Sequence, residues 1–112
     1  MDCIFCKIIN GDIPSKKVYE DDKMLAFYDI EPQAPVHVVI IPKQHIDSAN
    51  SLTQDNVEVV AHIFSVIPQI AKKLNLENGY RVVNNCGPDG GQTVFHLHFH
   101  LLGGKKLNTV MA

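Results

Sequence analysis

The chain has 112 residues, of which 46% are apolar and 20% charged, so it is long enough for one compact domain whose core needs no disulfide support. Ten Lys and Arg against twelve Asp and Glu give a formal net charge of −2, which argues against a protein whose main partner is a nucleic-acid polymer. No apolar run approaches the ~20 residues that span a bilayer, and the first residues lack the pattern of a signal peptide. We therefore expect a cytoplasmic protein without a membrane partner, in which Cys3, Cys6 and Cys86 are reduced.

The first half of the chain predicts short elements. Residues 3–11 are predicted to form a short helix that ends at Gly11, and Pro14 disfavours helix at the residue before it. Runs of β-branched and aromatic residues, separated by turn residues, predict three strands at residues 17–20, 24–30 and 36–41.

One long helix is predicted in the middle of the chain. Residues 51–54 have the pattern of a capping box, and apolar residues follow at spacings of three and four as far as Leu74. Pro68 should kink this helix because it removes one backbone hydrogen bond. The apolar residues form two stripes, which is more than one sheet face needs. The helix is therefore either deeply buried or part of a homodimer interface.

Two further strands are predicted at residues 80–85 and 94–102, joined by the Gly-rich loop 86–93. With the short N-terminal helix and the long one, they predict an α+β fold with a mostly antiparallel five-stranded sheet. We expect residues 1–112 to form a single domain.

Three histidines alternate with apolar residues at His96, His98 and His100. On a strand they share one face, with neighbours about 6–7 Å apart and the outer pair about 13 Å apart. That spacing prevents all three from meeting at one metal ion with bonds of ~2 Å, so at least one has another role. A purely structural role would need a hydrogen-bond partner for every buried ring nitrogen.

The chemistry of neutral imidazole favours a histidine nucleophile. Its unperturbed pKa of ~6.5 leaves it mostly neutral near pH 7, and its nitrogen attacks phosphorus readily. The loop 90–93 lies directly before the histidines, and we expect its backbone amides and the Thr93 hydroxyl to position a phosphate. A Gly-Gly loop by itself is more often a plain turn.

The segment from His96 to Leu102 resembles the signature of the histidine-triad (HIT) proteins. Nearly the whole chain shares the resemblance, because further matching segments occur in the expected order at residues 4–9, 26–30, 32–37, 90–93 and 102–104. The Pro-Gln-Ala-Pro run and the late Gly-Gly pair are similar to the Hint branch rather than to the dinucleotide-cleaving Fhit branch.

The resemblance implies a fold and an activity. Hint-like proteins are homodimers in which two five-stranded sheets join into one continuous sheet. They hydrolyse purine nucleoside 5′-phosphoramidates, which are AMP or GMP derivatives, through a covalent nucleotidyl-histidine and without an organic cofactor. The tail at residues 108–112 has no close match in this branch, which leaves the preferred leaving group open.

The resemblance also implies roles for individual residues. His98 would be the nucleophile, with its Nδ1–H held by the carbonyl of His96. The catalytic set would be His98, His100, His37 and Thr93, the last standing where serine is common. The nucleotide-binding set would comprise Phe5, Ile8, Phe27, Asp29, Ile30, Asn84, Gly91, Gln92, Thr93, His98 and His100. Within it, Asp29 would accept hydrogen bonds from the ribose, and the apolar members would enclose the base.

The Cys3-x-x-Cys6 pair has three interpretations: half of a zinc site, a redox pair, or two small buried side chains. A thioredoxin-like redox pair would need a preceding strand, for which the chain has no room. Some HIT proteins bind zinc through such a pair and two histidines, and the matching positions are His45 and His96. We therefore expect a structural zinc and an unreactive, buried Cys86.

Two other functions remain open at this point. One is a zinc-dependent hydrolase in which His96 and His98 are metal ligands, which predicts loss of activity on chelation and no covalent intermediate. The other is a non-catalytic nucleotide sensor or scaffold, which predicts tight binding of nucleoside monophosphates without turnover.

Overall fold

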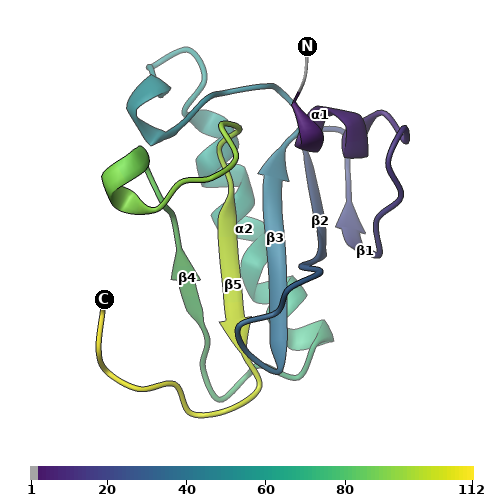
Figure 1. Cartoon of the computed structure of the whole chain (residues 1–112). Coiled ribbons are helices and arrows are strands. Elements are labelled where there is room, and N and C mark those ends of the chain that lie inside the picture. The colour runs from purple at the N-terminus through teal and green to yellow at the C-terminus, as the bar shows by residue number, and fades with distance from the viewer. Residues whose placement is uncertain (1–2) are drawn as a thin grey trace.

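The computed structural model describes residues 3–112, and Figure 1 shows its elements. In chain order they are α1 (Ile4–Ile9), β1 (Lys17–Glu20), β2 (Met24–Tyr28), β3 (Val36–Pro42), the 3₁₀ turn η1 (Ala49–Ser51), α2 (Glu58–Lys73), β4 (Arg81–Val83), the 3₁₀ turn η2 (Pro88–Gly90) and β5 (Phe99–Gly103).

The five strands form one sheet in the order β1-β2-β3-β5-β4, and every neighbouring pair is antiparallel. This arrangement confirms the predicted α+β fold. The strands are shorter than predicted in three places, because β2 ends at Tyr28, β4 covers only Arg81–Val83 and β5 begins at Phe99.

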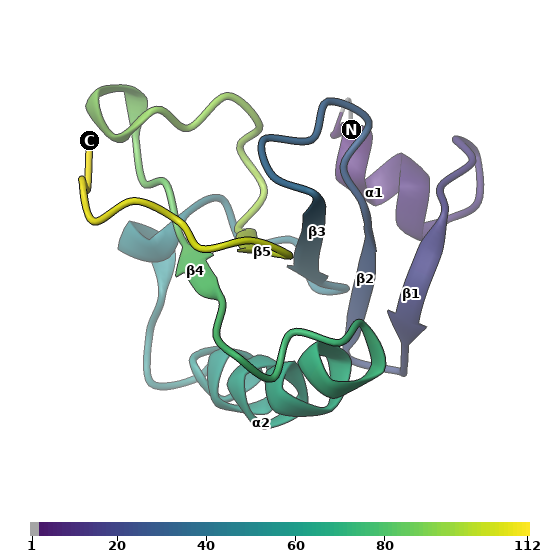
Figure 2. The ribbon, with the colours of Figure 1, turned by 90° about the horizontal axis from the view of Figure 1, so that it is seen from below.

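The two helices lie on opposite faces of the sheet, as the view in Figure 2 shows. Alternate residues of β3 face opposite sides of the sheet. Val38 and Ile40 belong to the core under α2, whereas Val39 and Ile41 pack with residues of α1 and β2. Because both faces are covered, β3 is apolar almost without interruption.

The start of α2 differs from the prediction. Residues 49–51 form a 3₁₀ turn, and the helix begins only at Glu58, with no side-chain cap at Val57. Thr53 caps a separate turn instead: its Oγ1 accepts from the amide of Asp55, and its carbonyl accepts from the amide of Val57. The predicted capping box is therefore wrong, because Ser51 is the last residue of the 3₁₀ turn and lies seven residues before the helix begins.

One side of α2 faces the sheet, through Ile63, Val66, Ile67, Ile70 and Ala71. Phe64, which shares a predicted stripe with Ile67 and Ala71, is 47% exposed, although its ring packs edge-on against Phe99 with centroids 5.5 Å apart. The helix is thus not deeply buried within one chain. None of the helices in the described part of the chain has the length and apolar composition that crossing a bilayer requires.

The histidine segment enters β5 later than predicted. Residues 94–98 lie outside the ladder, and the amide of Leu97 donates to the carbonyl of Ile46. The alternation nevertheless persists: Leu97 is buried in the core under α2, while His96 and His98 contact the ring of Phe5 on the other side. The three histidines therefore share one side of the sheet although only His100 is in a strand.

Candidate functional site

A cavity of about 480 Å³ opens on the α1 side of the sheet, within the volume range of small-molecule sites. Its walls come from α1, the connector to β1, β2, β3 and the histidine segment. Eight residues of the predicted nucleotide-binding set line it: Phe5, Ile8, Phe27, Asp29, Ile30, Thr93, His98 and His100.

One end of this cavity is apolar. Phe5 and Phe27 meet edge to face with ring centroids 5.8 Å apart, and Ile30 is 95% exposed at the rim. The ring centroid of Phe5 also lies 5.1 Å from that of His98. A single aromatic side chain thus joins the apolar end to the histidines.

His98 is held in one tautomer. Its Nδ1 lies 2.7 Å from the carbonyl oxygen of His96; because a carbonyl only accepts, Nδ1 carries the proton and Nε2 keeps a free lone pair. The Asn84 side-chain amide donates to the carbonyl of His98 at 2.9 Å. Neighbouring groups therefore fix both the ring and the backbone of the predicted nucleophile.

Asp29, His37 and His100 form a second polar group, which we call the histidine relay. The amide of Gln33 donates to Nδ1 of His37 at 3.0 Å, so His37 carries its proton on Nε2. That Nε2 lies 2.8 Å from Nδ1 of His100 and 3.5 Å from the Asp29 carboxylate. Nδ1 of His100 consequently accepts, and the proton of His100 is on its Nε2.

The relay histidines are neutral at pH 7. Burial, reinforced by neighbouring His98 and His37, lowers the pKa of His100 to about 4. Burial also lowers the pKa of His37, against the opposing effect of the Asp29 carboxylate. His100 is therefore a neutral hydrogen-bond donor, through Nε2, at the wall of the cavity.

The predicted zinc ligands converge into one group, the cysteine cluster, made of Cys3, Cys6, His45 and His96. Nδ1 of His96 lies 3.3 Å from Sγ of Cys3 and 3.6 Å from Sγ of Cys6. Nδ1 of His45 lies 3.3 Å from Sγ of Cys6. All four ligand atoms are within 4.8 Å of one another. The start of α1 positions both thiols, because Cys3 caps the helix and its sulfur accepts from the amide of Cys6.

This donor set fits zinc. Nε2 of His96 faces the Pro42 carbonyl at 2.8 Å, and Nε2 of His45 faces the Asp47 carboxylate at 2.7 Å. Both Nε2 atoms therefore carry protons, and both Nδ1 lone pairs point at the sulfurs, as in zinc sites whose histidines are oriented by outer acceptors. In a tetrahedral site with the usual bond lengths, sulfur and nitrogen ligands lie about 3.5 Å apart, close to the separations found here.

The redox interpretation of the cysteines has no support. Burial, together with the neighbouring Cys3, raises the pKa of the Cys6 thiol to about 11, whereas reactive cysteines have lowered pKa values. Cys86 is half-buried rather than buried, so this prediction was too strong.

The histidine relay does not suit a metal, although its three ligand atoms also lie within 4.8 Å of one another. Nε2 of His37 holds a proton because the Gln33 amide occupies Nδ1. His98 belongs to neither group of potential metal ligands in the described residues. A hydrolytic zinc held by His96 and His98 is therefore unsupported, since Nδ1 of His96 faces the thiols.

The backbone amides of the loop before the histidines donate to carbonyls of the same loop, which differs from the prediction. The amides of Gly90 and Gln92 donate to the carbonyl of Gly87, and the amide of Gly91 donates to the carbonyl of Pro88. These amides are consequently not free to hold a phosphate in this conformation. Only Thr93 of the loop 90–93 lines the cavity.

Gln92 and Asn84 do not line the cavity, and their side chains instead hydrogen-bond to the backbone around it. The Gln92 side chain accepts from the amide of Gly87 and donates to the carbonyls of Asp47 and Val94. The side-chain amide of Asn84 donates to the carbonyl of His98. Neither residue, nor Gly91, is among those that line the cavity.

Sequence reasoning missed the connector between α1 and β1. Ile13, Pro14, Ser15 and Lys16 line the cavity, as does Tyr28. The connector has no periodic pattern, and only the pairing of β1 with β2 brings it beside the site.

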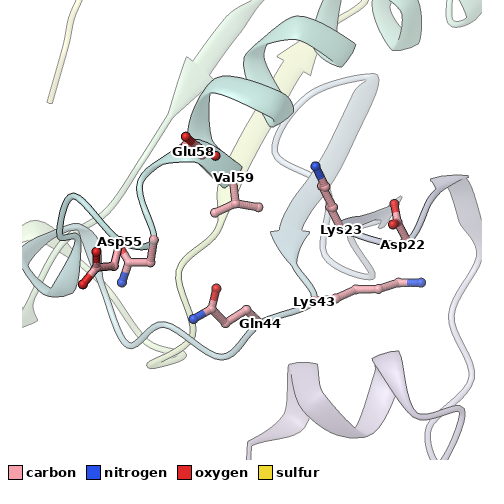
Figure 3. A pocket seen from close by; sticks show the side chains of 8 residues that line it. Asp22, Lys23, Lys43, Gln44, Asp55, Glu58 and Val59 are labelled. Carbon is pink, nitrogen blue, oxygen red and sulfur yellow. The ribbon is translucent and has the colours of Figure 1, made fainter.

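Another hollow, of about 280 Å³, lies between the β1–β2 turn, the end of β3 and the start of α2 (Figure 3). Its lining mixes carboxylates and ammonium groups and contains no histidine or cysteine: Asp22, Lys23, Lys43, Gln44, Asp55, Asn56, Glu58 and Val59. Lys43 is already paired with Glu20 at 2.8 Å. Nothing in this hollow indicates a chemical role.

Known proteins resemble this chain over nearly its whole length. The family model described as "Scavenger mRNA decapping enzyme C-term binding" matches residues 2–111. A histidine triad protein from Clostridium difficile is 55% identical, with a TM-score of 0.95 over 98% of this chain and 96% of that one. A HIT family hydrolase from Legionella pneumophila is 47% identical, with a TM-score of 0.93 over 96% and 97%.

A 14 kDa zinc-binding protein of Zea mays is 49% identical over 107 residues, which are 94% of this chain and 84% of the relative. These matches agree with the alternating histidines, the five-stranded sheet and the Cys and His cluster. The chain belongs to the histidine-triad (HIT) family.

Proposed function

We propose that this protein is a hydrolase that cleaves purine nucleoside 5′-phosphoramidates through a covalent nucleotidyl-histidine on His98. The proposal rests above all on the hydrogen bond from Nδ1 of His98 to the carbonyl of His96. It leaves the Nε2 lone pair of a cavity-lining imidazole free to attack phosphorus. The 47% identity to a HIT family hydrolase supports the same reaction class.

The nucleotide would bind in the cavity in a single orientation. The base fits the apolar end formed by Phe5, Ile8 and Phe27. Asp29 would accept hydrogen bonds from the ribose hydroxyls, and the phosphate would lie between Thr93 and the histidines. This order follows the wall of the cavity from the apolar rim to His98 and His100.

The reaction would have two steps. In the first, Nε2 of His98 forms a bond to the α-phosphorus as the phosphorus–nitrogen bond of the substrate breaks, and the departing amine takes a proton from solvent while the Nε2–H of neutral His100 donates a hydrogen bond to it. In the second, water attacks the phosphorus, the bond to His98 breaks, and the proton of the attacking water returns to solvent. The products are an amine and a nucleoside monophosphate.

We also propose that Cys3, Cys6, His45 and His96 hold a structural zinc. Four protein ligands leave no open position, so the metal would add stability and no chemistry. It would fix His96, whose carbonyl orients the nucleophile. The 14 kDa zinc-binding relative supports this part of the proposal.

Turnover of adenosine 5′-phosphoramidate, followed together with the intact mass of the protein, tests the function. We expect AMP release and a transient adenylate on His98. Folded protein that binds AMP but gives neither AMP release nor an adduct would favour the nucleotide sensor or scaffold. Turnover without an adduct would contradict the covalent step.

Homodimer formation is a further part of the proposal. β4 is an edge strand of the sheet, and three apolar side chains in or next to α2 and β4 are exposed: Val57, Phe64 and Tyr80. An edge strand and exposed large apolar side chains favour pairing with a second copy. Light scattering should give the mass of two chains. Phe64→Glu should weaken the dimer at least about tenfold, whereas Gln69→Glu, which adds the same charge elsewhere on α2, should not.

A further inference from the structure

The cavity runs across the sheet from one strand to the next. His100 is in β5, Val39 in β3, Phe27 in β2, and the connector 13–16 leads into β1 at the sheet edge. Three strand spacings of about 4.8 Å separate the two ends by about 14 Å. If the phosphate lies at the histidines, the outer edge of the base faces the connector.

The connector offers one side chain that is free to recognise a base. Ile13 and Pro14 have no polar side-chain atoms. The ammonium group of Lys16 lies over the ring of Tyr28, 5.6 Å from its centroid, an attractive cation–π geometry. Ser15 lines the cavity, and its Oγ is shielded from solvent without a hydrogen-bond partner in the described part of the chain.

An unpartnered buried hydroxyl is uncommon, because it loses its hydrogen bonds to water without replacement. Ser15 Oγ is the sole buried side-chain nitrogen or oxygen in this condition among the described residues. Rotation of the serine between staggered conformers would turn the hydroxyl towards a ligand in the cavity. A bound base would then supply the partner that the free chain lacks.

We propose that Ser15 determines base specificity by hydrogen bonding to the substituent at C6 of a purine. The inference rests on the proposed function, because its ligand is a nucleotide. A hydroxyl both donates and accepts, so it matches the 6-amino group of adenine as well as the 6-oxo group of guanine or hypoxanthine. It has no partner in a purine that carries hydrogen at C6.

Calorimetric binding of three 5′-monophosphates tests the proposal: AMP, IMP and purine riboside monophosphate. Wild-type protein should bind AMP and IMP about three- to tenfold more tightly than purine riboside monophosphate. Ser15→Ala should bind all three within about twofold, with the affinity for purine riboside monophosphate unchanged. Its Tm should equal or exceed that of the wild type, since alanine removes a hydroxyl that is unpartnered in the free chain.

Ser51→Ala, at an exposed serine of η1 outside the cavity, is the matched control and should keep the wild-type preference. Equal wild-type affinities for the three ligands overturn this inference alone, as does a Ser15→Ala protein that still prefers AMP and IMP. A Ser15→Ala protein with lower Tm and uniformly weaker binding makes Ser15 structural and also overturns it. Wild-type protein that binds none of the three contradicts the proposed function as well.

Discussion

The cysteine cluster and the histidine relay each contain two histidines, yet they are suited to different tasks. In the cysteine cluster, oxygen acceptors outside the group hold the Nε2 protons of His45 and His96, so both Nδ1 atoms are free to bind a metal. In the relay, a backbone amide donates to His37 and places its proton on the nitrogen that faces His100. The partner outside each group decides whether its ring nitrogens are free to accept a metal or carry protons that donate hydrogen bonds.

His98 links the two groups. Its ring packs edge to face against that of His100, with centroids 5.1 Å apart, and its Nδ1 donates to the carbonyl of His96. The cysteine cluster thus supports the proposed nucleophile through the backbone, whereas His100 of the relay packs against its ring. Removal of either group should therefore have separable consequences for stability and for rate.

The largest effect is expected at the shared residue. His98→Ala should lower the rate of phosphoramidate cleavage by at least about 10³-fold, because the covalent route is lost. AMP binding should persist, and mass spectrometry should detect no adduct. His62→Ala, which removes a histidine on α2 outside the cavity, serves as the control and should retain turnover. Wild-type turnover in His98→Ala would show that another group is the nucleophile.

The cysteine cluster should dominate stability. Metal analysis should find about one zinc per chain, and Cys6→Ser should remove it and destabilise the fold by about 3 kcal/mol or more. For a domain of this size the Tm falls by roughly 10 °C or more, measurable by calorimetry. A chelator should lower the Tm of the wild type but not that of the variant.

Cys86→Ser is the matched control for this test, because Cys86 lies outside the cluster. It should keep both the zinc and the Tm. Equal Tm values for wild type, chelated wild type and Cys6→Ser would exclude a structural metal at this position.

The relay should affect rate rather than metal content. His100→Asn should lower kcat about 10²-fold, because the imidazole N–H that hydrogen-bonds to the departing amine is lost, with a smaller change in KM. Zinc content should stay at the wild-type value. The two clusters would prove to be coupled, contrary to our interpretation, if this variant lost its metal.

The smallest expected effect is a dependence of stability on pH. The pKa of His100 is lowered to about 4 in the folded chain and is ~6.5 when unfolded. Above about pH 6.5 both states are neutral, so the residue contributes no pH dependence there. As the pH falls from about 6.5 to about 4, the unfolded chain binds more protons, and the free energy of unfolding decreases.

Denaturant titrations of wild type and His100→Asn measure this contribution. Over that pH range the wild type should lose about 1 kcal/mol more than the variant, a value reduced for solvent screening because His100 is only half-buried. Acid release of the proposed zinc would act on both proteins and cancel in the difference. Parallel pH profiles would show that burial does not hold His100 neutral.

Much of the fold was predictable because its signals are local. The β-branched run of β3 and the apolar stripe of α2 were assigned from a few neighbouring residues each. The errors arose where tertiary contacts replaced local ones. Ser51 ends a 3₁₀ turn rather than capping α2, and the amide of Leu97 donates to Ile46 rather than to a neighbouring strand.

The sequence by itself determined which histidines and thiols are brought together. Alternation with apolar residues places His96, His98 and His100 on one side, because Leu97 and Phe99 must be buried on the other. The Cys-x-x-Cys spacing places two thiols at one helix end. These properties depend on spacing alone.

Only the tertiary structure decided what each histidine is able to do. Which nitrogen of His96 carries the proton depends on the carbonyl of Pro42, 54 residues away in the chain. Which nitrogen of His37 carries the proton depends on the backbone amide of Gln33. The isolation of the Ser15 hydroxyl likewise depends on what packs around it. Hydrogen-bond partners are set by position in space, and residue type does not specify which nitrogen they occupy.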